Sequence, residues 1–366
     1  MYSSFTVDGF RGLDHLEVPL SRVTVVTGRN GVGKSALLEA LFLHACGAHA
    51  PMNALQVLRP MRHLLPLSRS QSGESVDPWR TFFPASAPSG PIRLVASVDG
   101  KQRGIELRPA AAASSGTVLM DVEGSPRTAV GLEVRVLGEE GAEHRDHRVL
   151  VALDITGTRM SFTAEPPVNE DGFEKVRIIK DVGAVDVVDA YTALRLSGGT
   201  SALVTALRSI EPRLVSLELL ASEGPTALHA VFEEGPPIPF TSLGTGIHRA
   251  LTYLLAASTA PGGLLLIDEI EDGLHHSVLV SMWSHLVEAT RATGTQLVVT
   301  THSDEAIQAA VLALRDGHLD ELSLVRLRDA RFDNGGWAGA AAGRVRPVVL
   351  SGAAVEQVLS VSAEVR

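Results

Sequence analysis

Gly28, Gly33, Lys34 and Ser35 have the types and the spacing needed to hold the phosphates of a nucleotide. Residues 28 to 35 read GRNGVGKS, with four residues between the first and last glycines and a lysine and a serine directly after. Glycines let consecutive backbone N–H groups turn toward a phosphate, and a helix start adds partial positive charge. In this pattern Lys34 reaches the β and γ phosphates, and Ser35 places its hydroxyl on Mg²⁺. The residues expected to bind the nucleotide are Gly28, Arg29, Asn30, Gly31, Val32, Gly33, Lys34, Ser35 and Ala36.

The segments around this loop are those that a phosphate loop requires. Residues 22 to 28, RVTVVTG, are largely β-branched and typical of a buried parallel strand. Residues 35 to 45, SALLEALFLHA, carry apolar residues at 37, 38, 41, 42 and 45, which is the spacing of one helix face. The alternative is an accidental glycine turn. Strand, glycine loop and helix in succession favour nucleotide binding.

Two acidic residues follow a second apolar run. GGLLLIDEIEDGLHHS, residues 262 to 277, contains four apolar residues that end at Asp268 and Glu269. Such a short run is typical of a central strand whose carboxyl end lies at the nucleotide, where Asp268 can hold Mg²⁺ through water. Glu269 can polarise the attacking water. Two acids after a strand also often cap the next helix, but the glycine loop upstream favours catalysis.

A histidine ends a third apolar run, QLVVTTHS, at residues 296 to 303. His302 is positioned there to sense or hydrogen-bond the γ-phosphate and the water. A lone histidine is usually a polar residue with satisfied hydrogen bonds, so its location after a strand is what carries the prediction. The predicted catalytic residues are Glu269, His302 and Lys34, and the predicted metal ligands are Ser35 and Asp268.

A second glycine-rich helix start lies within PFTSLGTGIHRALTYLLAAS, residues 239 to 258. Ser242, Gly244 and Gly246 leave little bulk and a free hydroxyl at the helix amino terminus, which predicts a second anion site. One chain does not need two such sites for one triphosphate, unless the second serves the nucleotide of another copy. Arg249, on the same helix, could reach a phosphate or make an ion pair at the surface.

In their order along the chain, five segments resemble the motifs of ABC-type ATPase heads of the SMC, RecF and OLD-like group. GRNGVGKS is similar to Walker A, SLGTG to the signature, LLLIDE to Walker B, EDGLHH to the D-loop and TTHS to the switch. The resemblance extends to FTVDGFRGLDHLEVPL at the start and covers residues 186 to 310. It implies an α/β P-loop NTPase fold of ABC-head architecture, with an antiparallel β insert and a helical segment, that uses ATP and Mg²⁺.

The same resemblance implies a homodimer that sandwiches ATP. Ser242, Gly244 and Gly246 of one copy are then expected to contact the ATP held by the other. The signature differs from the transporter sequence LSGGQ. Gln56 and Gln71 are both open candidates for the Q-loop glutamine, and Arg11 is a candidate nucleotide contact.

The chain divides into five segments on its patterns of turns and apolar residues. Short alternating stretches between about 91 and 165, separated by glycine turns, predict antiparallel strands, and Ser, Pro and Gly at 66 to 91 predict a surface loop. The expected segments are a first ATPase half at 1–65, a loop and β-rich insert at 66–185, a helical segment at 186–225, a second ATPase half at 226–310 and a strand and helix extension at 311–366.

The expected role is an ATPase that switches between open and closed homodimers and controls a separately encoded effector, in bacteria often in anti-phage defence. No heptads separate residues 34 and 268, which excludes a long coiled-coil arm, and the segment after His302 has no Toprim nuclease pattern. The alternative is an ATP-dependent DNA-binding clamp of repair or recombination. The net charge of −10 weakens it, because a polyanion then needs a local arginine cluster.

Composition bounds the remaining classes. The chain has 366 residues, 45% hydrophobic and 20% charged, which is typical of a soluble globular protein. No run of 18 apolar residues and no signal-peptide start are present, so we expect a cytoplasmic protein with no membrane contact. Cys46 is the only cysteine, which excludes an intrachain disulfide and a cysteine-based zinc site, and a buried apolar role is expected for it.

Overall fold

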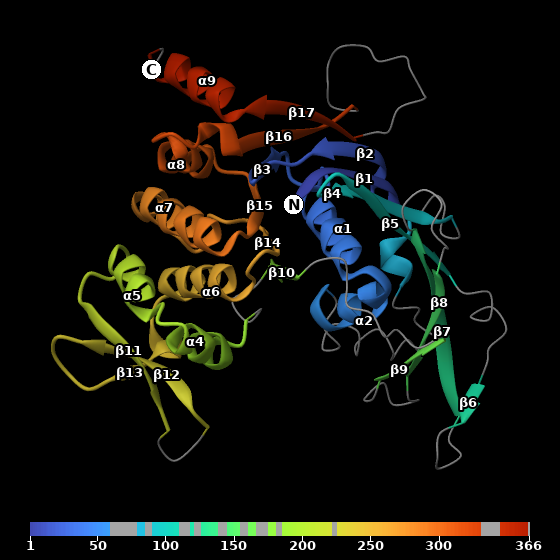
Figure 1. The fold of residues 1–366 in the computed structure, drawn as a ribbon, viewed down its shortest axis with the longest axis horizontal. Coiled ribbons are helices and arrows are strands. Elements are labelled where there is room, and N and C mark those ends of the chain that lie inside the picture. Colours follow the sequence, from blue (N-terminus) through green and yellow to red (C-terminus); the bar gives the residue numbers. More distant parts are fainter. Residues whose placement is uncertain are drawn as a thin grey trace.

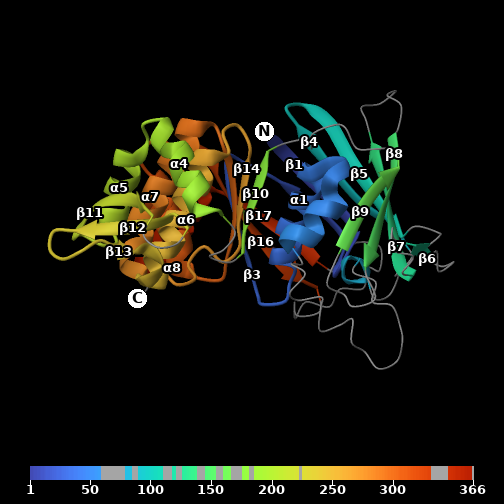
Figure 2. The same cartoon turned by 90° about the horizontal axis from the view of Figure 1, so that it is seen from below.

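The structure is a computed structural model that describes most of the chain in separate ranges. These ranges are residues 1–58, 79–84, 90–109, 118–120, 126–137, 145–153, 160–165, 175–180, 185–221, 225–330 and 345–364. Four layers succeed one another: a group of helices, a mainly parallel sheet, one central helix and an antiparallel sheet (Figure 1). Figure 2 shows the same order from below.

The mainly parallel sheet has six strands in the order β10-β14-β15-β3-β16-β17. Its first five strands are mutually parallel, and the last runs antiparallel to its neighbour. Parallel strands end at one common edge of a sheet, so the residues that follow them are brought together there. The strands are β10 (Val176–Ile179), β14 (Leu264–Ile267), β15 (Gln296–Thr301), β3 (Val23–Gly28), β16 (Leu322–Asp329) and β17 (Val345–Ser351).

The antiparallel sheet has eight strands and continues the amino-terminal hairpin into the expected β insert. Its order is β2-β1-β4-β5-β7-β8-β9, and β6 pairs with β7. Hairpin and insert are therefore one sheet rather than two units. The strands are β1 (Tyr2–Phe10), β2 (Leu13–Pro19), β4 (Ile92–Val98), β5 (Lys101–Pro109), β6 (Val118–Met120), β7 (Pro126–Leu137), β8 (Arg145–Leu153) and β9 (Met160–Glu165).

Helix α1 (Lys34–Cys46) lies between the two sheets, as Figures 1 and 2 show. All of its residues except Ser35 are buried. The sequence pattern indicated one apolar face, but a helix that is covered on all sides needs apolar residues all round, and Ala40 and Leu43 supply them. The helix that follows the phosphate loop is thus the centre of the core between the two sheets.

The carboxyl end of α1 is fixed by a buried histidine. Tyr2 Oη lies 3.0 Å from His44 Nδ1, and His44 Nε2 lies 3.0 Å from the carbonyl oxygen of Arg103. Burial lowers the pKa of His44 to about 4, so the ring is neutral and links α1 to β1 and β5. Two residues further on, burial raises the pKa of the Cys46 thiol to about 12, which fits the buried apolar role expected for it.

Three helices cover the other face of the parallel sheet. They are α6 (Thr245–Thr259), α7 (His276–Thr293) and α8 (Asp304–Leu314). Beyond them lies a smaller group of α4 (Val187–Leu196), α5 (Thr200–Arg208) and a three-stranded sheet of β11 (Leu214–Leu220), β12 (Ala227–Phe232) and β13 (Ile238–Pro239). The segment expected to be helical, 186–225, thus contains two helices and then a strand.

The remaining elements are short or terminal. The chain after α1 forms η1 (Gly47–His49), α2 (Ala50–Asn53) and η2 (Ala54–Leu58), and later short turns are η4 (Arg80–Phe82), η6 (Phe240–Ser242) and η7 (Leu319–Glu321). The end of the chain contains β16, which pairs with β3, then β17 and α9 (Gly352–Glu364). β10 falls inside the expected insert, yet it pairs with β14, so the mainly parallel sheet resumes before residue 185.

Candidate functional site

The glycine loop joins the end of β3 to the start of α1, as the sequence predicts. Gly28 and Gly33 have φ angles of 147° and 111°, a region that side chains rarely tolerate. A Cβ on Gly28 would also lie 2.5 Å from the carbonyl oxygen of Leu327 on β16. Gly28 therefore allows the loop to pack against the neighbouring strand, and Gly33 allows α1 to begin at Lys34.

Lys34 lies inside the loop rather than in solvent. Its side chain is largely buried, and Nζ donates hydrogen bonds to the carbonyl oxygens of Gly28 at 2.9 Å and Arg29 at 3.4 Å. The amino terminus of α1 has no side-chain cap. The loop thus presents an ammonium group and uncapped helix N–H groups at one point, which is the arrangement that favours an anion.

The two predicted metal ligands meet across the sheet edge. Ser35 Oγ donates to Asp268 Oδ1 at 3.0 Å, although the two residues are 233 positions apart. A hydroxyl and a carboxylate are the oxygen ligands that Mg²⁺ prefers beside phosphate and water. The donor set therefore fits the magnesium nucleotide expected from the sequence.

Glu269 has an unusual backbone and an exposed side chain. Its φ angle is 52°, one of three positive values among non-glycine residues in the described ranges. Its backbone N–H donates to Thr300 Oγ1 at 2.8 Å, and its carbonyl accepts from the Asp272 N–H at 2.9 Å. The tight turn after β14 leaves Asp268 buried and Glu269 accessible to solvent, so two adjacent carboxylates occupy different environments.

A cavity of about 350 Å³ unites the phosphate loop with Glu269. Residues from five separate segments line it, which the topology explains because their strands and turns end at the same edge. Arg11 and Gly12, from the turn between β1 and β2, form one wall. The expected nucleotide contact Arg11 thus lines the loop cavity. The other lining residues are Asn30, Gly31, Val32, Gly33, Lys34, Ser35, Ala36, Glu269, Asp329 and Val345.

His302 lines a second cavity, of about 810 Å³, at the same loop. Asn30, Gly31 and Val32 line both cavities, and Val355 of α9 lines the second one. The ring is half exposed, and its Nδ1 lies 2.9 Å from Glu271 Oε1, which also accepts the His302 backbone N–H at 2.9 Å. Glu271 therefore holds the ring so that Nε2 points away from it.

The predicted second anion site stands apart from the loop. Ser242 and Gly244 are exposed, and none of Ser242, Gly244 and Gly246 lines either cavity at the phosphate loop as far as the described residues define them. Gly244 precedes α6 and gives the helix no side-chain cap, so its first N–H groups remain open. Within one chain, the structure does not bring the two predicted anion sites together.

The helix behind this site packs on the turn that follows Asp268 and Glu269. A Cβ on Gly246 would lie 2.9 Å from the carbonyl oxygen of Gly273. Arg249 makes an ion pair with Asp272 and donates to Tyr253 Oη at 3.3 Å. The sequence left open whether Arg249 contacts a phosphate or makes an ion pair, and the structure shows the ion pair.

Three polar residues at the site were missed by the sequence patterns. Thr300, on β15, contacts Asp268 and Glu269, and Glu271 contacts His302. Glu39, on α1, has a fully buried side chain that pairs with Arg11 at 2.8 Å and Lys180 at 2.5 Å. Each of these residues lies in an apolar or acidic stretch. The spacing of residues in such a stretch predicts the helix, strand or turn but not the residue that a polar side chain contacts, so only the structure identifies these contacts.

The fold supports neither of the two candidates for the Q-loop glutamine. Gln56 belongs to η2 beyond the carboxyl end of α1, and Gln71 lies outside the described residues. Lys180, in contrast, directly follows β10 at the edge where the parallel strands end. The residue that follows β10, the strand beside β14, is thus a lysine rather than a glutamine.

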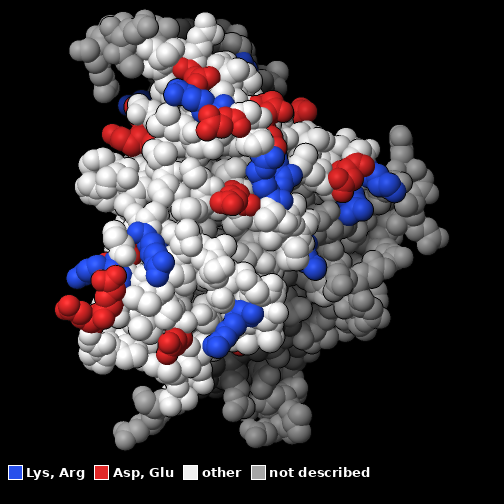
Figure 3. Space-filling view, turned by 60° about the vertical axis from the view of Figure 1, so that its left-hand side comes forward, with Lys and Arg blue, Asp and Glu red and all other residues white. Residues whose placement is uncertain are grey.

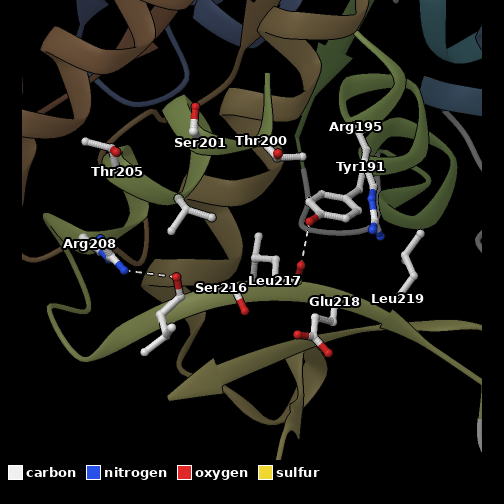
Figure 4. A pocket seen from close by; sticks show the side chains of 12 residues that line it. Tyr191, Arg195, Thr200, Ser201, Thr205, Arg208, Ser216, Leu217, Glu218 and Leu219 are labelled. Carbon is white, nitrogen blue, oxygen red and sulfur yellow. Dashed lines mark hydrogen bonds between the residues drawn. The ribbon is translucent and has the colours of Figure 1, made fainter. Parts of the chain in front are cut away.

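The groove of about 670 Å³ in Figure 4 lies away from the site, between α4, α5 and β11. Tyr191 Oη donates to the carbonyl oxygen of Leu217 at 2.6 Å, and Arg208 donates to those of Leu214 at 2.6 Å and Val215 at 3.0 Å. These side chains occupy backbone acceptors of the edge strand β11. They protect that edge from pairing with another strand.

Two family models match parts of the chain. Residues 164–308 match the model described as "AAA domain, putative AbiEii toxin, Type IV TA system", and residues 1–51 match "Protein of unknown function (DUF2813)". The first range contains the segments that resemble the signature, Walker B and switch motifs, and the second contains the glycine loop. A comparison with curated proteins gives no match.

Solved structures of SMC heads align with nearly the whole chain. The SMC head domain from Thermotoga maritima has 13% identity and a TM-score of 0.43, over 96% of this chain and 99% of that one. An SMC head bound to the C-terminal winged-helix domain of ScpA has 14% identity and a TM-score of 0.48, over 96% and 98%. An SMC head with an extended coiled coil, bound to the C-terminal domain of ScpA derived from Pyrococcus furiosus, has 12% identity and a TM-score of 0.44, over 100% and 99%.

The expected α/β P-loop NTPase fold, with an antiparallel β insert and a helical segment, is confirmed by the strand order and by the match to an AAA domain. The AAA match supports a P-loop ATPase, whereas the OLD-like part of the resemblance has no counterpart in the comparisons. No helix in the described ranges is long and apolar enough to cross a membrane.

Proposed function

We propose that the protein binds and hydrolyses ATP and that ATP drives two copies together. The observation that carries the proposal is the meeting of Lys34, Ser35 and Asp268 at the end of the parallel sheet, with Glu269 lining the same cavity as the loop. The AAA-domain match supports it. A cation, two oxygen ligands and an accessible carboxylate are the groups that phosphoryl transfer to water requires.

Each residue has a separate role in this proposal. Lys34 moves its hydrogen bonds from the loop carbonyls to the phosphates, and Ser35 and Asp268 hold Mg²⁺, which neutralises phosphate charge when bound. Glu269 accepts a proton from the attacking water, for which its exposed position in the cavity is suited. His302, oriented by Glu271, donates a hydrogen bond to the γ-phosphate side of the site.

The second copy supplies the second anion site. Ser242 and the open N–H groups at the start of α6 are exposed and remote from the loop cavity of their own chain. We propose that they contact the ATP of the partner copy, so that bound ATP joins the two chains. Hydrolysis then removes the γ-phosphate contacts that favour the closed dimer.

We further propose that the closed dimer controls a separately encoded effector in anti-phage defence. The description of the family model matched by residues 164–308 names a type IV TA system, which supports a defence role. The alternative DNA clamp has weaker support. On the face in Figure 3, basic and acidic side chains are interspersed and form no basic band that could follow a nucleic acid backbone.

The experiment that tests the dimer is light scattering after gel filtration of Glu269→Gln with ATP and Mg²⁺. This variant should bind ATP without hydrolysing it and should elute as a dimer with ATP and as a monomer without it. The matched control combines Lys34→Ala with Glu269→Gln and should remain monomeric in both conditions. A monomer of Glu269→Gln at saturating ATP would contradict the proposed switch.

A further inference from the structure

We infer that Thr300 is a positioning residue, whose single hydroxyl fixes both the Asp268 carboxylate and the backbone of Glu269. The inference rests on the proposed function, because it concerns how the same two carboxylates are held. Thr300 lies on β15, the strand beside β14, and its side chain is fully buried. The sequence patterns assign no role to Thr300 itself, so only the fold indicates this role.

The direction of each hydrogen bond at Thr300 is fixed by its partners. Oγ1 lies 2.6 Å from Asp268 Oδ1 and 2.8 Å from the backbone nitrogen of Glu269. An amide N–H can only donate and an ionised carboxylate can only accept, so the hydroxyl donates to Asp268 and accepts from Glu269. The Thr300 carbonyl accepts the Ile270 N–H at 3.1 Å. One residue thus contacts three consecutive positions after β14.

The first consequence concerns the Asp268 carboxylate. Oδ1 accepts from both Ser35 Oγ and Thr300 Oγ1, whereas Oδ2 has no hydrogen bond within the described chain. The carboxylate is therefore held by one oxygen, and the other is available to a cation. Partners of this kind orient metal ligands, and their loss typically costs about 10- to 100-fold in metal affinity or activity.

The second consequence concerns the backbone of Glu269. A non-glycine residue at a φ angle of 52° is strained, and such a backbone persists only where the surroundings hold it. The hydroxyl of Thr300 accepts the N–H of this strained residue and so stabilises the turn. Because the turn separates the exposed Glu269 from the buried Asp268, the same hydroxyl sets the relative placement of the two carboxylates.

The test compares Thr300→Val, which keeps the shape but removes the hydroxyl, with Thr300→Ser, which keeps the hydroxyl. The readouts are the hydrolysis rate and the Mg²⁺ dependence of binding of a fluorescent ATP analogue. For Thr300→Val we expect the Mg²⁺ concentration at half-saturation to rise about tenfold or more and kcat to fall about 10- to 100-fold. Binding of the analogue in EDTA should change less than about twofold, because the loop is intact. Thr300→Ser should stay within about threefold of the wild type.

Thr24→Val is the matched control. Thr24 is equally buried in the same sheet, but it lies at the opposite, amino-terminal end of β3 and bonds to Ser21. It should lower the thermal midpoint without changing the Mg²⁺ dependence. If Thr300→Val does not fold, Thr300→Ala removes the same hydroxyl and has the same expected result.

The outcomes separate the two proposals. Wild-type Mg²⁺ dependence and kcat in folded Thr300→Val or Thr300→Ala would overturn the role of Thr300 and leave the ATPase intact. A wild-type protein that binds no ATP analogue at any Mg²⁺ concentration would overturn the proposed function and the inference together.

Discussion

The amino termini of α1 and α6 are both preceded by glycines and lack side-chain caps, but the polar residues that surround them differ. At α1, Lys34, Ser35 and Asp268 converge within hydrogen-bonding distance of the loop or of one another. At α6, Ser242 and Gly244 are exposed, and Arg249 on the same helix is paired with Asp272. One terminus gathers a cation and two oxygen ligands, whereas the other is the terminus that we propose contacts the ligand of a second copy.

The difference follows from where the two helices start. α1 begins at the common edge of five parallel strands, where polar residues from several strand ends are gathered. α6 begins outside that edge, on the helical side, and packs on the turn after Glu269. A shared site therefore requires a second chain, and substitutions at the two termini should have separable effects.

Substitution of Lys34 should have the largest effect. Lys34→Ala removes the only lysine of the loop and its charge-assisted hydrogen bonds, so affinity for ATP should fall about 10- to 100-fold and hydrolysis by at least a further 100-fold. Isothermal titration and phosphate release measure the two effects. Unchanged binding would mean that the nucleotide lies elsewhere.

Substitution of Ser242 should separate binding from hydrolysis. Ser242→Glu places a negative charge at the start of α6, so it should repel the partner's triphosphate and lower hydrolysis more than about tenfold. Binding by the monomer should stay within about threefold, because Ser242 does not line the loop cavity. Ser201→Glu, at an exposed serine of α5, is the control and should change neither quantity. Loss of binding by the Ser242→Glu monomer would show that the two termini belong to one intrachain site.

Removal of the Glu271 carboxylate should have a moderate effect on the rate alone. Glu271→Ala frees the ring of His302 to rotate, and kcat should fall about tenfold while ATP affinity is retained. Glu288→Ala removes a largely exposed carboxylate 4.0 Å from His285 on α7 and serves as the control. Single-turnover hydrolysis distinguishes the two variants, and equal rates would exclude a positioning role for Glu271.

The last prediction concerns stability rather than catalysis and tests how firmly α1 is held. The buried His44 has its pKa lowered to about 4, below its unfolded value of about 6.5, so the unfolded state binds more protons between these values. Stability should therefore fall as the pH falls through this window, by up to about 3 kcal/mol from this residue. Urea unfolding of the wild type and of His44→Asn measures the free energy of unfolding at each pH. The same pH dependence in both proteins would contradict a contribution from His44.

Local patterns predicted most of the nucleotide edge. The glycine loop, the short apolar runs and the residues that end them are adjacent in sequence. Period and spacing therefore place Asp268 and His302 after strands and Lys34 at the helix start after the loop. The structure puts Ser35 and Asp268 in contact as expected. Their roles toward ATP and Mg²⁺ remain predictions that the substitutions above address.

Long-range partners could not be predicted in the same way. Thr300 lies within an apolar strand, Glu39 within an apolar helix and Glu271 within an acidic turn. The partners of all three are distant in sequence, the nearest being Arg11 for Glu39. The extent of the β insert was also hidden, because β1 and β4 pair across the whole of α1 and the segment after it. Pairing across such distances depends on the fold rather than on local period.

The most direct test of the shared site is complementation between the two termini. Lys34→Ala and Ser242→Glu should each be inactive alone, but in an equimolar mixture half of the dimers combine one of each and contain one intact composite site. Hydrolysis should then recover to about a quarter of the wild-type rate, as expected for a symmetric two-site dimer. A mixture whose rate equals the sum of the separate variants would contradict a nucleotide held between two copies.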